Sequence, residues 1–259
     1  MTHSDAQDDD RPAARRSNGK LIGFGALLLF WFVAFCVLGT WQVHRLSWKL
    51  NLIATVDRRV HAPPVAPPGP ADWSPQDVAD YNYLHVRVRG TFLNDRETLT
   101  QAVSEQGPGF WVMTPLRTDQ GFNLLVNRGF VPDDHRQAAT RRAGLPQGEV
   151  TVIGLVRLSE PKGGFLQSNK PASDEWHSRD VAAIAAKRGL GDVAPYFVDA
   201  DAAPNPGGWP LGGQTVVSFP NNHLQYAITW YGLAVLMLVG GVLLVRGERA
   251  ARRSGASGE

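Results

Sequence analysis

Two long stretches without charged side chains dominate this sequence. No Asp, Glu, Lys, Arg or His occurs in residues 21–43, and none occurs in residues 224–245. At about 1.5 Å of rise per residue, either run is long enough as a helix to cross the roughly 30 Å hydrocarbon core of a bilayer. We therefore predict two transmembrane helices, residues 21–43 and 223–245, with one domain of residues 44–222 between them.

The basic residues predict which side of the membrane each part faces. Lys and Arg flank the first run on both sides, but four arginines follow the second run and no Lys or Arg lies between Arg188 and Arg246. Basic flanks favour the cytoplasm. We expect two cytoplasmic tails, a disordered one at residues 1–20 and a basic one at residues 246–259. In a bacterial inner membrane the domain would then be periplasmic.

A cleaved signal peptide is the alternative interpretation of the first run. Arg15, Arg16 and Lys20 would form its basic region. The apolar run is longer than such signals have, however, and no small-x-small cleavage site follows it. The sequence therefore favours a permanent membrane anchor.

Composition excludes several classes of protein. The only cysteine, Cys36, lies inside the first apolar run, which rules out an intramolecular disulfide and argues against thiol redox chemistry. The formal net charge is only +2, and the basic residues are dispersed, so we expect no nucleic-acid partner.

The central domain has the pattern of a sheet protein. Residues 83–92 alternate apolar and polar side chains, as a half-buried strand does. Five further segments, bounded by Gly, Pro, Asn and Asp, are predicted strands: residues 97–103, 109–117, 122–130, 150–158 and 214–219. The helical pattern of the first span continues past residue 43 to about Val60, and a proline-rich connector follows at residues 63–75.

Two short helices are predicted within the domain. Ser74 should cap one that starts at Pro75, and Ser178 should cap an alanine-rich helix, residues 181–187, that ends at a left-handed Gly189. The fold class is thus α+β: two transmembrane helices flank a mainly antiparallel β extracytoplasmic domain with a few short helices.

His223 is the leading candidate for a binding site because it immediately precedes the second apolar run. An imidazole at the lipid–water boundary suits haem iron, whose macrocycle is apolar while its propionates need water and cations. Tyr226 and Trp230 would share a helical face with His223 and could stack beside a porphyrin. The alternative is an ordinary interfacial histidine within an aromatic belt.

The end of the first run repeats this arrangement. Trp41 and Arg45 lie there, followed by Trp48 and Lys49. The two cations could pair with propionates or lipid phosphates, or could simply extend toward the interface.

No catalytic motif is present. Nucleophile elbows, zinc-binding His pairs and Cys-x-x-Cys motifs are missing, and Asp133-Asp134-His135 is too contiguous for one metal ion. We therefore expect no enzymatic activity.

Together, these segments resemble the surfeit-locus protein one family over residues 39–234. The motifs that carry the resemblance are, in order, Gly39-Thr40-Trp41-Gln42, Arg45, Trp48-Lys49, Val88-Arg89-Gly90-Thr91-Phe92, Gly107-Pro108-Gly109-Phe110, Thr114-Pro115-Leu116, Leu125-Val126-Asn127-Arg128-Gly129-Phe130, Trp176, Arg179-Asp180, Gly208-Trp209-Pro210, Gly213-Gln214-Thr215, Asn222-His223-Leu224, Tyr226-Ala227 and Thr229-Trp230.

The resemblance implies an assembly factor for haem–copper cytochrome c oxidase that assists haem a insertion into the catalytic subunit. The family's haem a ligand maps onto His223. The catalytic subunit, a haem a synthase and the lipid bilayer are the implied partners. The alternative is a cofactor-free membrane scaffold that stabilises the immature subunit. The residues that maintain the fold and dock on the subunit would then be Arg89, Gly90, Asn127, Arg128 and Gly129. A copper donor is disfavoured, because the domain between the spans has Met113 as its only sulfur ligand.

Overall fold

The computed structural model describes residues 18–161, 163–164 and 167–255, which form two compact units. The first unit contains residues up to Leu52 together with those from Phe219 onward, and the second contains Ile53–Ser218. The predicted N-terminal tail lies outside the described residues up to residue 17. Of the predicted C-terminal tail, residues 246–255 are helical and the remainder lies outside the described residues.

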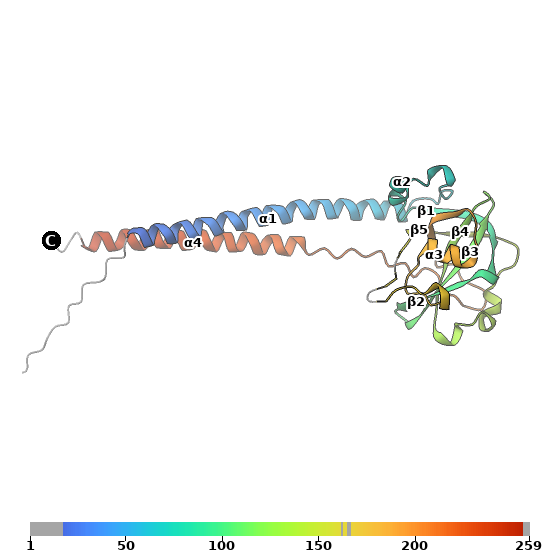
Figure 1. The fold of residues 1–259 in the computed structure, drawn as a ribbon. Coiled ribbons are helices and arrows are strands. Elements are labelled where there is room, and N and C mark those ends of the chain that lie inside the picture. Colours follow the sequence, from blue (N-terminus) through green and yellow to red (C-terminus); the bar gives the residue numbers. More distant parts are fainter. Residues whose placement is uncertain (1–17, 162, 165–166, 256–259) are drawn as a thin grey trace, which may run out of the picture. The chain divides into compact units, whose positions relative to one another are not determined.

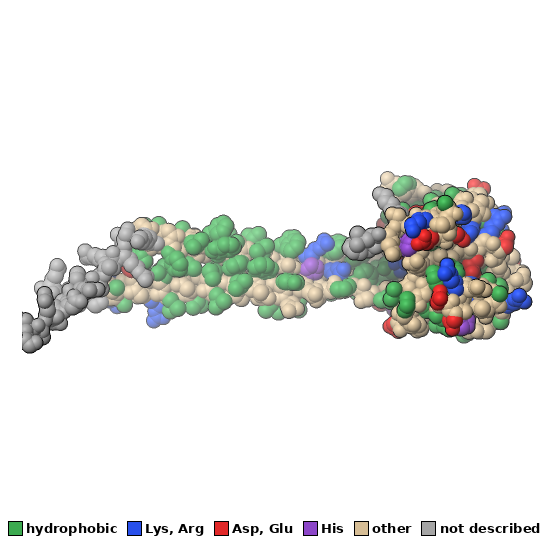
Figure 2. Space-filling model, turned by 60° about the horizontal axis from the view of Figure 1, so that its bottom comes forward, with side chains coloured by type: hydrophobic (Ala, Val, Ile, Leu, Met, Phe, Trp, Pro, Cys, Tyr) green, Lys and Arg blue, Asp and Glu red, His purple; other side chains and the backbone are tan. Residues whose placement is uncertain are grey.

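The first unit consists of α1 (Asn18–Val60) as far as Leu52 and of α4 (His223–Gly255), two helices that lie side by side in Figure 1. Both are long and apolar enough to span a membrane, and only 0% and 6% of their apolar windows are buried within the protein. A core helix of a soluble protein would be mostly buried, so the exposed apolar surface of these helices suits a membrane span better than a soluble core. Figure 2 shows hydrophobic side chains covering the visible face of this unit.

Small residues allow the two helices to approach closely. A Cβ added at Gly39 would lie 2.9 Å from the ring of Tyr231, so a larger residue there would require that ring to move. Ala227 is 2% exposed, and the rings of Phe35 and Trp230 stack at 5.7 Å between centroids. Close approach through small side chains is the usual way for helices to pack where lipid removes the hydrophobic driving force.

The final turns of α1 belong to the second unit. Arg59 donates hydrogen bonds to the backbone carbonyl oxygens of Asp80, at 2.6 Å, and Asn82, at 3.3 Å. The predicted continuation of the first helix beyond residue 43 is confirmed.

The second unit is built on a six-stranded sheet in the order β1-β5-β6-β4-β3-β2. Its strands are β1 (His85–Phe92), β2 (Thr98–Ser104), β3 (Gly107–Thr118), β4 (Asn123–Val131), β5 (Glu149–Leu158) and β6 (Val193–Ala200). The end of β1 also pairs with β3, which closes five strands into a ring and leaves β2 as an edge. All pairings are antiparallel except β4 with β6. The predicted class is confirmed.

Short helices join and cover the strands. These are α2 (Pro75–Asp80), α3 (Val181–Arg188) and five 3-10 helices: η1 (Pro70–Asp72), η2 (Asn94–Arg96), η3 (Asp133–His135), η4 (Ala138–Gly144) and η5 (Pro171–Ser173).

Two apolar clusters hold the sheet unit together. The first gathers inward-facing residues of β1 and β3–β6, among them the fully buried Val86, Leu124 and Tyr196. The second lies under α3, where Ile184 packs with Trp176 and other buried residues. Because strand side chains alternate in direction, one strand supplies residues to both clusters.

One predicted strand does not exist, and one strand was not predicted. Residues 214–219 form no strand, although their composition predicted one, and β6 was missed. Four consecutive residues of β6 are buried, so apolar and polar side chains do not alternate there. Strands buried on both faces carry no period-2 signal.

One of the two predicted helix caps was misassigned. Ser74 caps α2 and accepts the backbone N–H of Asp77, as predicted. The cap of α3 is Asp180, whereas Ser178 donates to the carbonyl of Glu160 at 2.6 Å. The predicted left-handed end at Gly189 is confirmed, with a φ of 61°.

We predict that Gly129→Ala lowers the free energy of unfolding by about 3 kcal/mol or more. Gly129 has a φ of +127°, and a Cβ there would lie 2.0 Å from the carbonyl oxygen of Leu211. Because that oxygen belongs to the backbone, a side-chain rotation cannot relieve the clash. Thermal unfolding of the full chain in detergent measures the effect. Gly191→Ala is the control, because a Cβ there meets nothing within 4 Å. Equal unfolding temperatures for the two variants would contradict this account.

Candidate functional site

His223 is the first residue of α4 and is held by a residue of α1. Its backbone follows Asn222, whose carbonyl accepts the N–H of Tyr226 and so opens the helix. Its ring nitrogen Nδ1 lies 2.8 Å from Oε1 of Gln42, a side chain only 8% exposed. The imidazole is partly exposed, so one side of the ring is fixed while the other stays accessible.

The hydrogen bond to Gln42 selects the form of the imidazole. An amide oxygen only accepts hydrogen bonds, so Nδ1 of His223 must carry the proton that it donates. In the neutral ring the lone pair then lies on Nε2. Metal-binding histidines are commonly held in this way, with the non-ligating nitrogen donating to an oxygen acceptor. The residues present therefore fit an axial ligand for haem iron.

The other four predicted site residues are placed differently from one another. Trp230 stacks on Phe35 between the helices. Tyr226 and Trp41 are 53% and 56% exposed, free to meet lipid or a flat ligand. Arg45 is exposed, and its guanidinium lies 4.0 Å from the centroid of the Trp48 ring. The residue of α1 that contacts His223 is thus Gln42. From the sequence, Arg45 was predicted as a site residue and Gln42 was not.

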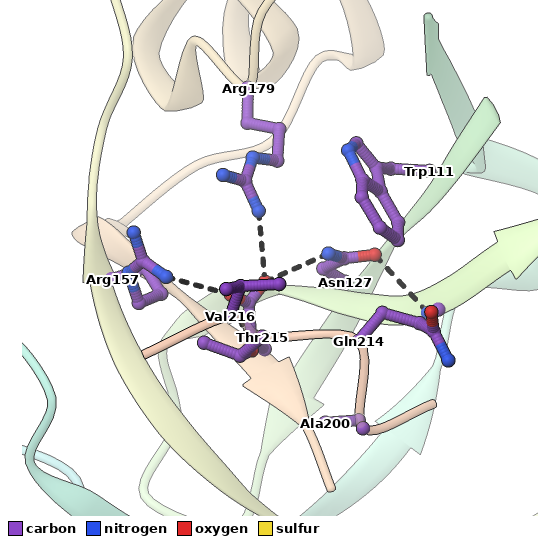
Figure 3. Close-up of a pocket in the computed structure, with 11 residues that line it drawn as sticks. Trp111, Asn127, Arg157, Arg179, Ala200, Gln214, Thr215 and Val216 are labelled. Carbon is purple, nitrogen blue, oxygen red and sulfur yellow. Dashed lines mark hydrogen bonds and ion pairs between the residues drawn. The ribbon is translucent and has the colours of Figure 1, made fainter. Parts of the chain in front are cut away.

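A second polar site lies in the sheet unit around Asp199 of β6, which is 4% exposed (Figure 3). Its Oδ1 accepts from Asn127 Nδ2 at 2.8 Å and Arg179 Nη1 at 3.1 Å. Its Oδ2 accepts from Thr215 Oγ1 at 2.9 Å and Arg157 Nη1 at 3.4 Å. A buried carboxylate is stable only when it is paired in this way.

Arg179 joins Asp199 to a second carboxylate. Its Nε and Nη2 donate to the two oxygens of Glu160 at 3.1 and 2.5 Å. Burial lowers the pKa of Arg179, but the two carboxylates outweigh it and raise the pKa above its usual value. Arg179 therefore stays charged and holds the segment before α3 to β6 and to the segment that follows β5.

A cavity of about 240 Å³ lies over this network. Trp111, Gly129 and Gln214 line it together with residues of the network and three smaller apolar neighbours, Ala200, Gly213 and Val216. Asn127, Arg179 and Thr215 belong to motifs of the family resemblance, but Asp199 and Arg157 carry no local signal. Asp199 lies in the strand that the sequence did not predict, so only the fold brings the five residues together.

The motif residue Arg128 is structural. It is 3% exposed, donates to the carbonyl oxygen of Gly144, and its guanidinium lies 4.8 Å from the centroid of the Phe92 ring. Burial lowers the pKa of Arg128 to about 10, with Glu97 acting in the opposite direction. Glu97 itself pairs with Arg141, so Arg128 is a buried cation stabilised by carbonyl and aromatic groups.

No cluster of three or more His, Cys, Asp or Glu suited to a metal ion occurs among the described residues. In η3, the ring nitrogen Nδ1 of His135 lies 2.9 Å from Oδ1 of Asp134. The same ring packs against Trp209 at 4.8 Å between centroids. This run therefore has a local structural role.

We predict that Glu160→Gln removes part of the pH dependence of stability. Burial raises the pKa of Glu160, but the hydrogen bonds and charge of Arg179 outweigh it and hold the pKa below its ordinary value. A depressed carboxyl pKa stabilises the fold above the unfolded pKa of about 4.3, and the stabilisation disappears as pH falls through the folded pKa. Thermal unfolding from pH 7 to pH 3 should show a gap between wild type and variant that closes below about pH 4. A constant gap would contradict the prediction.

Comparison with known proteins places the chain in a family. Residues 29–235 match the SURF1 family, a range that includes Gln42, His223 and the Asp199 network. Human Surfeit locus protein 1 is 43% identical over 214 residues, covering 76% of this chain and 69% of the relative. The rat Surfeit locus protein 1 is 41% identical over 226 residues, covering 79% and 72%. A SURF1-like protein of Monosiga brevicollis is 38% identical over 256 residues, covering 94% of both chains. A match of this length and identity shows that the chain belongs to the SURF1 family.

Proposed function

We propose that this chain is a non-enzymatic assembly factor for cytochrome c oxidase, in which His223 holds haem a for insertion into the catalytic subunit. Family membership supports the role in assembly. The observation that carries the cofactor proposal is the 2.8 Å contact between Gln42 Oε1 and His223 Nδ1. When bound, haem a supplies an iron that takes a neutral imidazole as an axial ligand.

The surroundings of His223 support an amphipathic ligand. The apolar run of α4 begins at the next residue, so the imidazole lies at the polar end of a predicted span. Tyr226, at i+3, presents an exposed ring for a porphyrin face. Lys49 and Arg45 supply cations in the last turns of α1 before the sheet unit, where propionates would find charge partners.

The same proposal assigns partners and location. The catalytic subunit would receive the cofactor, a haem a synthase would supply it, and both spans would lie in the lipid of a bacterial inner membrane. Four arginines after the second span support cytoplasmic termini, with the sheet unit in the periplasm. Cysteine accessibility labelling of single introduced cysteines in each part would test this orientation.

We expect His223→Ala to abolish the Soret absorbance of protein purified from cells that make haem a, because the axial ligand is lost. His44→Ala is the matched control, since His44 is an exposed histidine of α1 near the same end of the span. It should keep full occupancy. Full haem occupancy in His223→Ala would reject His223 as a ligand and favour the cofactor-free scaffold.

Gln42→Leu should weaken haem affinity by about 10- to 100-fold, the usual effect of losing the residue that orients a metal-binding histidine. Gln42→Glu keeps an oxygen acceptor for Nδ1 and should restore most of the affinity. Haem titration followed by absorbance measures both variants. Equal affinity for Gln42→Leu and wild type would show that the hydrogen bond only joins the two helices.

A further inference from the structure

We propose that the cavity over Asp199 is a binding site for a carboxylate attached to a flat apolar group. The site lies within the sheet unit and does not depend on His223 or on haem. Figure 3 shows Arg157 and Arg179 on one side of the pocket and Trp111 and Gln214 on the other. The polar groups and the aromatic wall therefore face a shared space.

The cavity has an excess of hydrogen-bond donors. Both oxygens of Asp199 already accept two hydrogen bonds each. Arg157, in contrast, makes one long contact with Asp199 at 3.4 Å, and its Nε is buried with no hydrogen-bond partner among the described residues. A buried guanidinium nitrogen without a partner is unfavourable, so the donors of Arg157 are incompletely satisfied within the protein. An acceptor that reaches the Arg157 guanidinium from the cavity would therefore gain free energy.

Geometry favours a carboxylate as that acceptor. A planar guanidinium matches a carboxylate with two parallel hydrogen bonds. The Arg157 guanidinium lies 4.8 Å from the centroid of the Tyr83 ring, a cation–π contact that restrains its position. The side chains of Arg157 and Arg179 keep 20% and 14% of their surface exposed, so a solute can reach them.

Size limits the ligand. The cavity volume of about 240 Å³ lies below the roughly 300–1,000 Å³ of pockets that hold drug-sized molecules. A haem or a nucleotide is therefore excluded. A group of the size of one aromatic side chain fits, with its flat face on Trp111 and its carboxylate toward Arg157.

The carboxylate could belong to a small free acid or to the end of a polypeptide, and the probes distinguish these sources. Benzoate represents the free acid, with benzamide as its uncharged isostere. Acetyl-alanyl-phenylalanine represents a polypeptide end, with its carboxamide as the matched control. Saturation-transfer NMR of each probe against the full chain in detergent reports binding.

We expect benzoate to bind only in the millimolar range, because its carboxylate can accept from Arg157 but Asp199 and Glu160 offset the charges of the two arginines. Benzamide should bind at least about tenfold more weakly, because it offers no carboxylate to the guanidinium. Tighter binding of the acetylated dipeptide than of benzoate would identify a polypeptide end as the source, and the reverse would identify a small acid. No transfer to either carboxylate, or equal transfer to benzoate and benzamide, would overturn the proposal.

Two variants locate the binding. Arg157→Gln should lower benzoate affinity about tenfold or more, whereas Arg136→Gln, an arginine stacked on Phe110, should not. Gln214→Glu places a carboxylate inside the cavity at unchanged size and should abolish benzoate binding. Gln106→Glu, on an exposed turn, is its control and should leave benzoate binding unchanged. Unchanged benzoate binding in both Arg157→Gln and Gln214→Glu would overturn the proposal, even if one of these variants were less stable.

Discussion

The buried carboxylate of Asp199 is the interaction on which the sheet unit depends. It joins β6 to β4 through Asn127, to β5 through Arg157, to the segment before α3 through Arg179, and to the segment after β6 through Thr215. A charge buried to this extent is tolerated only if every lone pair is used. The network therefore reinforces the pairing of β6 with β4 and β5, and it ties to them the segments before α3 and after β6. It also lines the cavity.

The helical unit follows a different physical rule. In lipid, apolar side chains gain little by meeting each other, so helix pairing relies on close approach and on hydrogen bonds. Gly39 allows the first, since a Cβ there would press on the ring of Tyr231. Gln42 and His223 supply the second. The same contact that joins the helices also sets the proton on Nδ1, which links membrane packing directly to the proposed ligand chemistry.

Sequence reasoning was most successful where the signal is local. The helix of α1, the start of α4 at His223 and five of the six strands follow from apolar runs and alternation. It failed at β6 and at residues 214–219. Burial on both faces hides β6, while the β-branched residues Thr215, Val216 and Val217 suggest a strand that has no place in the ladder.

The sequence by itself determined the two apolar helices, the antiparallel character of most of the sheet and the prominence of His223, because each depends on side chains close together along the chain. Only the tertiary structure decided the parallel pairing of β4 with β6, the closure of β1 on β3 and the two polar sites. The physical reason is distance along the chain: Gln42 and His223 are 181 residues apart, and Asn127 and Asp199 are 72 apart. No local pattern records which distant partner will complete a buried hydrogen bond.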